Sequence, residues 1–171
     1  MLMNLPVRVA LVVQYLHFGS CFVWSFILCC VLMNTDSFSN INWLAVLVAA
    51  IAFFLLGALW YSFLFRDAWI KASGVNVNDP NAKKGVGAMF LSSFVLIVIT
   101  SVGVALFTAR VGSGGWMTGL KVGLVAGICF CATSISNSYL YEKRPLALHL
   151  INGLYNVIGC VIAGIIIAIW K

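Results

Sequence analysis

Apolar residues in this chain gather into five long stretches, residues 9–33, 43–65, 88–107, 116–136 and 147–170, with polar segments between them. The stretch 43–65 contains no charged residue. A helix needs about 20 apolar residues to cross a hydrocarbon core of ~30 Å, whereas a water-soluble helix needs only an apolar stripe. The pattern therefore predicts five transmembrane helices.

The same stretches decide the expected fold class. Inside lipid every backbone polar group must be satisfied within the protein, which leaves helices and closed barrels. Barrel strands alternate apolar and polar positions with a period of two, and these stretches do not. We expect an all-α, polytopic membrane helical bundle.

Composition agrees with a membrane protein. Apolar residues make up 63% of the chain and charged residues 8%, with a mean hydropathy of +1.09, whereas ordinary soluble domains carry about 25% charged residues. The net charge of +6 comes from ten Lys and Arg against four Asp and Glu. Because nearly all of these charges lie outside the apolar stretches, they indicate orientation and contact with the lipid bilayer, and we expect no nucleic-acid partner.

The connecting segments carry positive charge unevenly, which predicts an orientation. One side of the predicted bundle collects Arg8, Arg66, Lys71, Lys83, Lys84, Lys143 and Arg144, and the other side collects Arg110, Lys121 and Lys171. Cytoplasmic loops are enriched in Lys and Arg. We expect the N-terminus on the cytoplasmic or matrix side, in a bacterial plasma membrane or a mitochondrial inner membrane.

A ladder of glycines at intervals of four residues, Gly115, Gly119, Gly123 and Gly127, runs along the fourth stretch. Such small-residue faces let two helix backbones approach closely in lipid. The ladder predicts a helix-packing face. It suits either another helix of the same chain or a neighbouring protein.

Polar residues inside the apolar stretches are costly in lipid and therefore indicate contacts. His149, Asn152 and Asn156 follow the spacing i, i+3, i+7, so they share one helical face, and Gln14 and His17 form a similar i, i+3 pair. This intramembrane polar face must point into the bundle or at a partner. It suits interhelical hydrogen bonds or a ligand site.

We expect neither a cofactor nor a metal. His17 lies ~12 Å into its helix at helical rise whereas His149 lies near the start of its own, so a haem bound by both would have to bridge that offset. No Cys-x-x-Cys-His motif is present, and the six cysteines, all within predicted helices, fit no zinc spacing. A single axial histidine ligand is an alternative that the sequence does not support.

The sequence also lacks a recognisable catalytic constellation. The four carboxylates, Asp36, Asp67, Asp79 and Glu142, fall in loops or at the ends of helices, and neither His-Glu-x-x-His nor Gly-x-Ser-x-Gly occurs. We therefore expect a non-catalytic protein.

Aromatic and charged residues cluster where the second predicted helix leaves the membrane. Aromatic side chains are enriched at membrane interfaces, so an interfacial belt accounts for most of this string. The expected interfacial motif comprises Trp60, Tyr61, Arg66, Asp67, Trp69 and Arg144.

Two segments carry a resemblance to a known family: 42–50 with 57–62, Phe65 and Ala68-Trp69, and Asn137 with 139–145, 150–153 and Tyr155. Together they resemble the uncharacterised membrane family catalogued as domain of unknown function 1761. The resemblance covers about residues 41–171 and implies a four-helix membrane domain, with residues 1–40 as an added N-terminal helix and loop. It implies no activity. Phe63 stands where a proline is common in this family, which leaves a kink at that position open.

These observations favour an accessory or structural subunit of a larger membrane assembly, packing through small-residue helix faces against other integral membrane subunits or itself. The alternative is a small-solute transporter or channel, acting as a homo-oligomer and lined by His149, Asn152 and Asn156. The direction of that polar face separates the two, because a subunit points it into protein and a transporter into a wet cavity.

Overall fold

The computed structural model describes residues 41–75, 85–112 and 114–170, and every regular element within these ranges is helical. The chain divides into two units at Ser39 and Asn40, and the described residues belong to the second. Four of its helices are long and apolar enough to cross a membrane: Trp43–Leu64, Val86–Val111, Gly115–Tyr141 and Leu146–Ile169. The predicted all-α membrane bundle is confirmed, and the protein is an integral membrane protein. The predicted helix 9–33 lies outside the described residues.

The first described helix changes geometry along its length. α3 (Trp43–Leu59) begins at Asn42, whose side-chain oxygen accepts a hydrogen bond from the Ala45 amide at 3.2 Å, and it continues as a π-helical turn, η1 (Trp60–Leu64). The helix breaks at Phe65 (φ −123°, ψ 16°), and the short α4 (Arg66–Ser73) follows. The direction of the chain thus changes without a proline at Phe63.

The next two membrane helices are separated by only three residues in the sequence. α5 (Val86–Val111) ends at Gly112, whose φ of +95° is a conformation that glycine adopts without steric cost. α6 (Gly115–Val125), the π-helical segment η2 (Ala126–Ala132) and α7 (Thr133–Tyr141) then follow as one continuous rod. This rod is the predicted helix 116–136, extended through residues 137–141.

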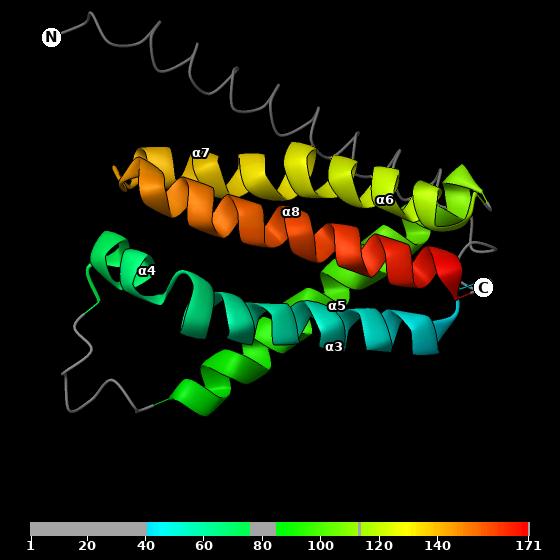
Figure 1. Cartoon of the computed structure of the whole chain (residues 1–171), viewed down its shortest axis with the longest axis horizontal. Coiled ribbons are helices and arrows are strands. Elements are labelled where there is room, and N and C mark those ends of the chain that lie inside the picture. The colour runs from blue at the N-terminus through cyan, green and yellow to red at the C-terminus, as the bar shows by residue number, and fades with distance from the viewer. Residues whose placement is uncertain (1–40, 76–84, 113, 171) are drawn as a thin grey trace, which may run out of the picture. The chain divides into compact units, whose positions relative to one another are not determined.

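The last helix, α8 (Leu146–Ile169), is the centre of the bundle (Figure 1). It packs most extensively against α6 and also contacts α3, α5 and η2. It runs antiparallel to α3, because Asn42 at the start of α3 donates to the Trp170 carbonyl (3.3 Å) and Trp60 at the other end donates to the Ile151 carbonyl (3.2 Å). α5 crosses the other helices obliquely (Figure 1).

Small residues are prominent among the most deeply buried positions. Ala45, Ala49 and Ala50 of α3 are fully buried, and so are Cys160 and Ala163 of α8. Phe53 is the largest of the fully buried side chains, and its ring occupies the space that a side chain at Gly159 would need. Close backbone approach and van der Waals packing hold membrane helices together, because lipid is as apolar as the core.

A compact turn joins α7 to α8. The Arg144 amide donates to the Tyr139 carbonyl (3.0 Å) and the Lys143 amide donates to the Leu140 carbonyl (3.2 Å), while Lys143 itself has φ +53°. This is the hydrogen-bond pattern of a Schellman cap with a lysine in the left-handed position usually held by glycine. Pro145 then opens α8.

Candidate functional site

The glycine ladder packs within the chain. A side chain at Gly119 would strike the backbone of Gly164, one at Gly123 would lie 2.5 Å from the Cys160 carbonyl oxygen, and one at Gly127 would lie 2.6 Å from the Val157 Cα. The three glycines therefore form the surface on which α8 lies.

Gly115 does not share this contact. It starts α6 with φ +62°, and nothing lies within 4 Å of the place a side chain would take. Of the two partners that the sequence left open for the ladder, a helix of the same chain is the one that Gly119, Gly123 and Gly127 contact.

The polar face of α8 meets hydroxyl groups from two other helices. The Tyr61 hydroxyl donates to the side-chain oxygen of Asn152 at 2.8 Å, and the Asn152 amide nitrogen donates to the Tyr139 hydroxyl at 2.7 Å. The amide nitrogen of Asn156 donates to the backbone carbonyl of Asn152 at 2.8 Å. Asn152 thus joins η1, α7 and α8 through both ends of its side chain.

Aromatic rings surround this polar centre. The ring of Tyr61 lies edge-on to Trp69 at 5.7 Å and to Tyr155 at 5.2 Å, and Tyr139 lies edge-on to His149 at 5.4 Å. Such edge-to-face pairs add about 0.5–1.5 kcal/mol each beyond the area they bury. The π-helical turn η1 supplies Tyr61 and directs it at α8.

Trp60, a member of the expected interfacial motif, is buried inside the bundle. It is 6% exposed, and its indole donates to the Ile151 carbonyl while its ring packs on Phe65 at 4.6 Å. Tyr61 is likewise half-buried against α8. The sequence string therefore includes two residues that fasten α3 to α8.

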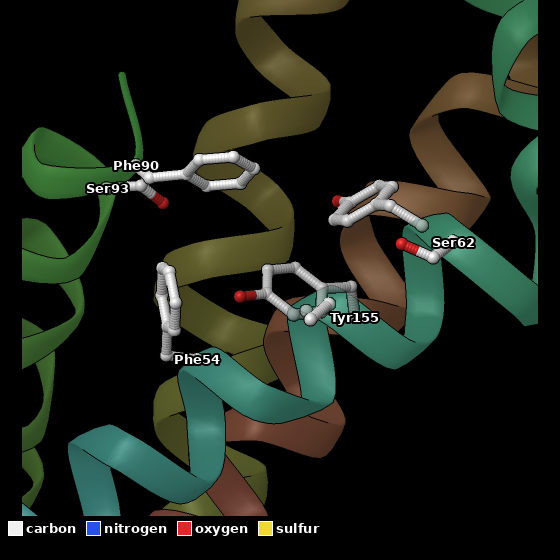
Figure 2. Close-up of a pocket in the computed structure, with 8 residues that line it drawn as sticks. Phe54, Ser62, Phe90, Ser93 and Tyr155 are labelled. Atoms are coloured by element: carbon white, nitrogen blue, oxygen red, sulfur yellow. The ribbon is translucent and has the colours of Figure 1, made fainter. Parts of the chain in front are cut away.

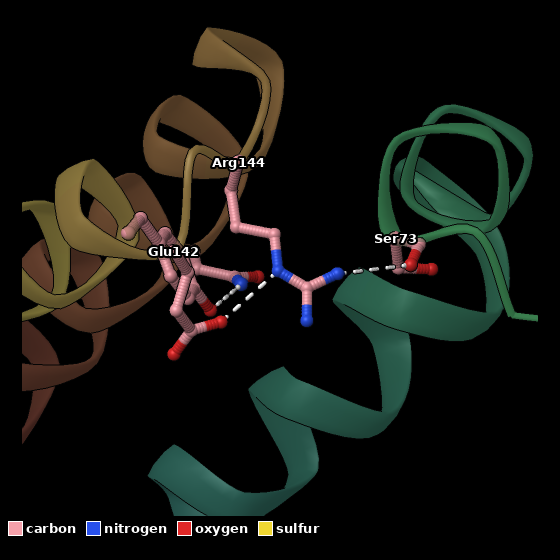
Figure 3. Close-up of polar contacts among 5 residues, drawn as sticks. Ser73, Glu142 and Arg144 are labelled. Atoms are coloured by element: carbon pink, nitrogen blue, oxygen red, sulfur yellow. Dashed lines mark hydrogen bonds and ion pairs between the residues drawn. The ribbon is translucent and has the colours of Figure 1, made fainter.

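The charged members of the expected interfacial motif stand apart from this cluster. Arg66 and Asp67 lie 3.8 Å apart and are both largely exposed. Arg144 pairs with Glu142 at 3.0 Å and donates to the Ser73 carbonyl at 3.4 Å, so it joins the turn before α8 to the end of α4 (Figure 3). An ion pair this exposed contributes about 0–1 kcal/mol.

His149 is buried near the start of α8. No group of three or more His, Cys, Asp or Glu side chains within the described ranges is placed to hold a metal ion. The thiols of Cys131 and Cys160 lie 3.8 Å apart as free cysteines between η2 and α8. Gln14 and His17 lie outside the described residues.

A second polar face emerges on the outer side of α7. Ser134, Asn137, Ser138 and Tyr141 are all exposed, and their spacing of i, i+3, i+4, i+7 places them on one face of the helix. Ser134 and Ser138 also form a small-xxx-small pair of the kind found at helix interfaces in lipid. No side-chain hydrogen bond joins these residues to the rest of the described chain. We call these four residues the α7 polar face.

Sequence reasoning missed the α7 polar face because it ended the fourth membrane helix at residue 136. The residues beyond that point were therefore predicted to form a connecting loop, in which exposed polar side chains are common. The signal was present in the spacing of Ser134, Asn137 and Ser138, which continues the helical period past that boundary.

The comparison with known families gives one result. A family model described as "Protein of unknown function (DUF1761)" matches residues 44–168. No curated protein and no solved structure matches the chain.

Proposed function

The chain belongs to the DUF1761 family of proteins of unknown function, and we propose that it is a non-catalytic accessory or structural subunit of a larger membrane assembly. The observation that carries this proposal is the α7 polar face. Exposed polar side chains on a membrane-spanning helix are costly in lipid and are ordinarily covered by protein.

The depth of the α7 polar face follows from its neighbour. Asn152 lies ~9 Å beyond Leu146, the first residue of α8, at a rise of about 1.5 Å per residue. The Tyr139 side chain of α7 is bonded to Asn152, and at the same rise Asn137 and Ser134 lie ~6 Å and ~11 Å before Tyr141, the last residue of α7. Asn137 and Ser134 therefore lie below the membrane surface.

Two other exposed hydroxyl groups on membrane helices are hydrogen-bonded within their own helix. Ser92 is also exposed on a membrane helix, but its hydroxyl donates to the Met89 carbonyl at 3.0 Å. The Thr133 hydroxyl likewise donates to the Cys129 carbonyl. The Asn137 amide has two donors and an acceptor that its own helix leaves unused. A neighbouring helix with polar side chains would satisfy them.

The internal polar face supports the same choice. Both ends of the Asn152 side chain are hydrogen-bonded, one to Tyr61 and the other to Tyr139, so this polar centre points into protein. A transporter or channel needs such groups available to water or solute, and for that reason we place the homo-oligomeric transporter second. The glycine ladder packs against α8 within the chain. We therefore propose that the small and polar residues of α7 contact the partner protein.

Orientation follows from the charges near α4 and the turn before α8. Arg144 reaches Ser73 across these two segments, and Arg66, Lys71 and Lys143 lie in the same segments. We propose that this end lies on the cytoplasmic or matrix side of a bacterial plasma membrane or mitochondrial inner membrane. Because the sequence predicts one further membrane helix before α3, we propose the same side for the N-terminus.

Paired serine substitutions test the proposed subunit role. Ser138→Leu removes a polar group from the α7 polar face, whereas Ser92→Leu makes the same change on α5. After gentle detergent extraction, we expect Ser138→Leu and Asn137→Leu to release the chain from its assembly while Ser92→Leu leaves the native mass unchanged. If the face contacts lipid only, Asn137→Leu stabilises the chain without altering its mass, and the proposal fails.

A further inference from the structure

A cavity of about 570 Å³ opens beside the aromatic cluster, between α3 and α5. One wall is formed by Phe54, Gly57 and Ala58 of α3, the other by Phe90 and Ser93 of α5 (Figure 2). Its volume falls within the range of about 300–1,000 Å³ typical of small-molecule sites. Ala58 and Phe90 are exposed, so the cavity opens on the outer surface of the bundle.

Aromatic and small residues give the cavity its shape. The ring of Phe54 stands edge-on to Phe90 at 6.2 Å and to Phe94 at 5.6 Å, which fixes one end. Gly57 leaves room for the Tyr155 ring, because a side chain there would lie 2.8 Å from the Tyr155 hydroxyl oxygen. A glycine at this position therefore allows Tyr155 of α8 to reach the cavity.

Hydroxyl groups provide the polar part of the lining. Figure 2 shows the Tyr155 hydroxyl directed toward the space between Phe54 and Phe90, with the Ser93 hydroxyl turned toward the same space. Tyr155 makes ring contacts with Phe53, Trp60 and Tyr61, but its hydroxyl bonds to no described residue. A hydroxyl donor in apolar surroundings gains from an acceptor on a ligand.

Charge and depth restrict what that ligand is. None of the residues that line the cavity is charged, so nothing there neutralises a phosphate or carboxylate. Gly57, against which the Tyr155 hydroxyl lies, is ~10 Å from Leu64 at the end of its membrane helix. The ligand's polar atom therefore lies below the level of phospholipid headgroups, which excludes a lipid held by its head.

We propose that this cavity binds an uncharged lipophile whose carbonyl oxygen accepts a hydrogen bond from Tyr155. An isoprenoid quinone and a neutral acyl ester such as a diacylglycerol share this chemistry, and both dissolve in the bilayer interior onto which the cavity opens. The proposal is independent of the subunit role, since the cavity lies on α3 and α5 and the α7 polar face on another helix.

Native mass spectrometry of the full chain in detergent tests the proposal with three probes: decylubiquinone, dioleoylglycerol and the charged dioleoylphosphatidylglycerol. We expect one molecule of a neutral probe to bind in preference to the charged one, and the probe that binds identifies the source of the carbonyl. Tyr155→Phe, which removes only the unbonded hydroxyl, should weaken binding about 3- to 10-fold.

A filling substitution and its control complete the test. Ala58→Phe places a ring in the cavity and should abolish binding, whereas Ala88→Phe adds the same ring at an exposed position on α5 outside the cavity and should not. Equal binding by Ala58→Phe and the unmodified chain, unchanged affinity in Tyr155→Phe, or preference for the charged lipid would each overturn the proposal.

Discussion

Replacing Gly123 by alanine puts a methyl group where the backbone of α8 already lies. The new carbon would sit 2.5 Å from the Cys160 carbonyl oxygen and 2.6 Å from the Val161 Cα. Non-bonded carbon atoms pack at about 3.5–4.0 Å, so α6 and α8 would have to separate by ~1 Å. Backbone atoms cannot rotate away as a flexible side chain does.

The energetic cost has two parts of opposite sign. Overpacking a close contact costs about 1–3 kcal/mol. Alanine also gains up to about 1 kcal/mol over glycine within a helix. Gly103→Ala isolates the second part, because Gly103 lies within α5 and nothing stands within 4 Å of its added carbon. The difference between the two variants therefore equals the steric cost alone.

The assay is the free energy of unfolding in mixed micelles, followed by helical circular dichroism during a titration with sodium dodecyl sulfate. We expect Gly123→Ala to be less stable than Gly103→Ala by about 1–3 kcal/mol. Equal stability of the two variants would refute the close contact between α6 and α8.

Three further predictions use the same assay. Asn152→Leu should lower the free energy of unfolding by about 1 kcal/mol, because it removes two interhelical hydrogen bonds that average about 0.6 kcal/mol each. Asn156→Leu loses only a bond within α8 and should lower the free energy of unfolding by less. The reverse order of the two variants would count against the hydrogen-bond network. Trp60→Phe should cost about 1–2 kcal/mol through loss of its bond to the Ile151 carbonyl, and an unchanged value would mean that the indole is not anchored. Lys143→Gly should raise stability by about 1 kcal/mol because a left-handed φ strains a lysine, and a loss of stability would contradict the cap geometry.

The sequence predicted the membrane helices well because length and apolarity decide them. The four helices in the described residues occur where the apolar stretches lie, with ends displaced by a few residues. The exception is the end of the predicted helix 116–136, since residues 137–141 continue the helix. Hydropathy identifies segments that are apolar enough to lie in lipid, and the apolar stretch ends at Ser136. The backbone nevertheless remains helical to Tyr141.

The candidate site was predictable only in part. The spacing of Asn152 and Asn156 predicted a polar face that points into the bundle or at a partner. It did not identify Tyr61 and Tyr139 as its hydrogen-bond partners, because they come from other helices. The sequence predicted Trp60 to be an interfacial aromatic residue. Its burial depends on the π-helical turn, which no residue propensity in the sequence predicts. The cavity depends likewise on how α3 and α5 cross.

Crosslinking from position 137 in native membranes tests the subunit role most directly. A photoreactive amino acid replaces Asn137, and the same residue at Val95, an exposed apolar position on α5, serves as the control. The subunit proposal predicts an adduct of defined mass with another membrane protein or a second copy of this chain from position 137, and lipid adducts from position 95. Lipid adducts alone, or a crosslink within the same chain, from position 137 would contradict it.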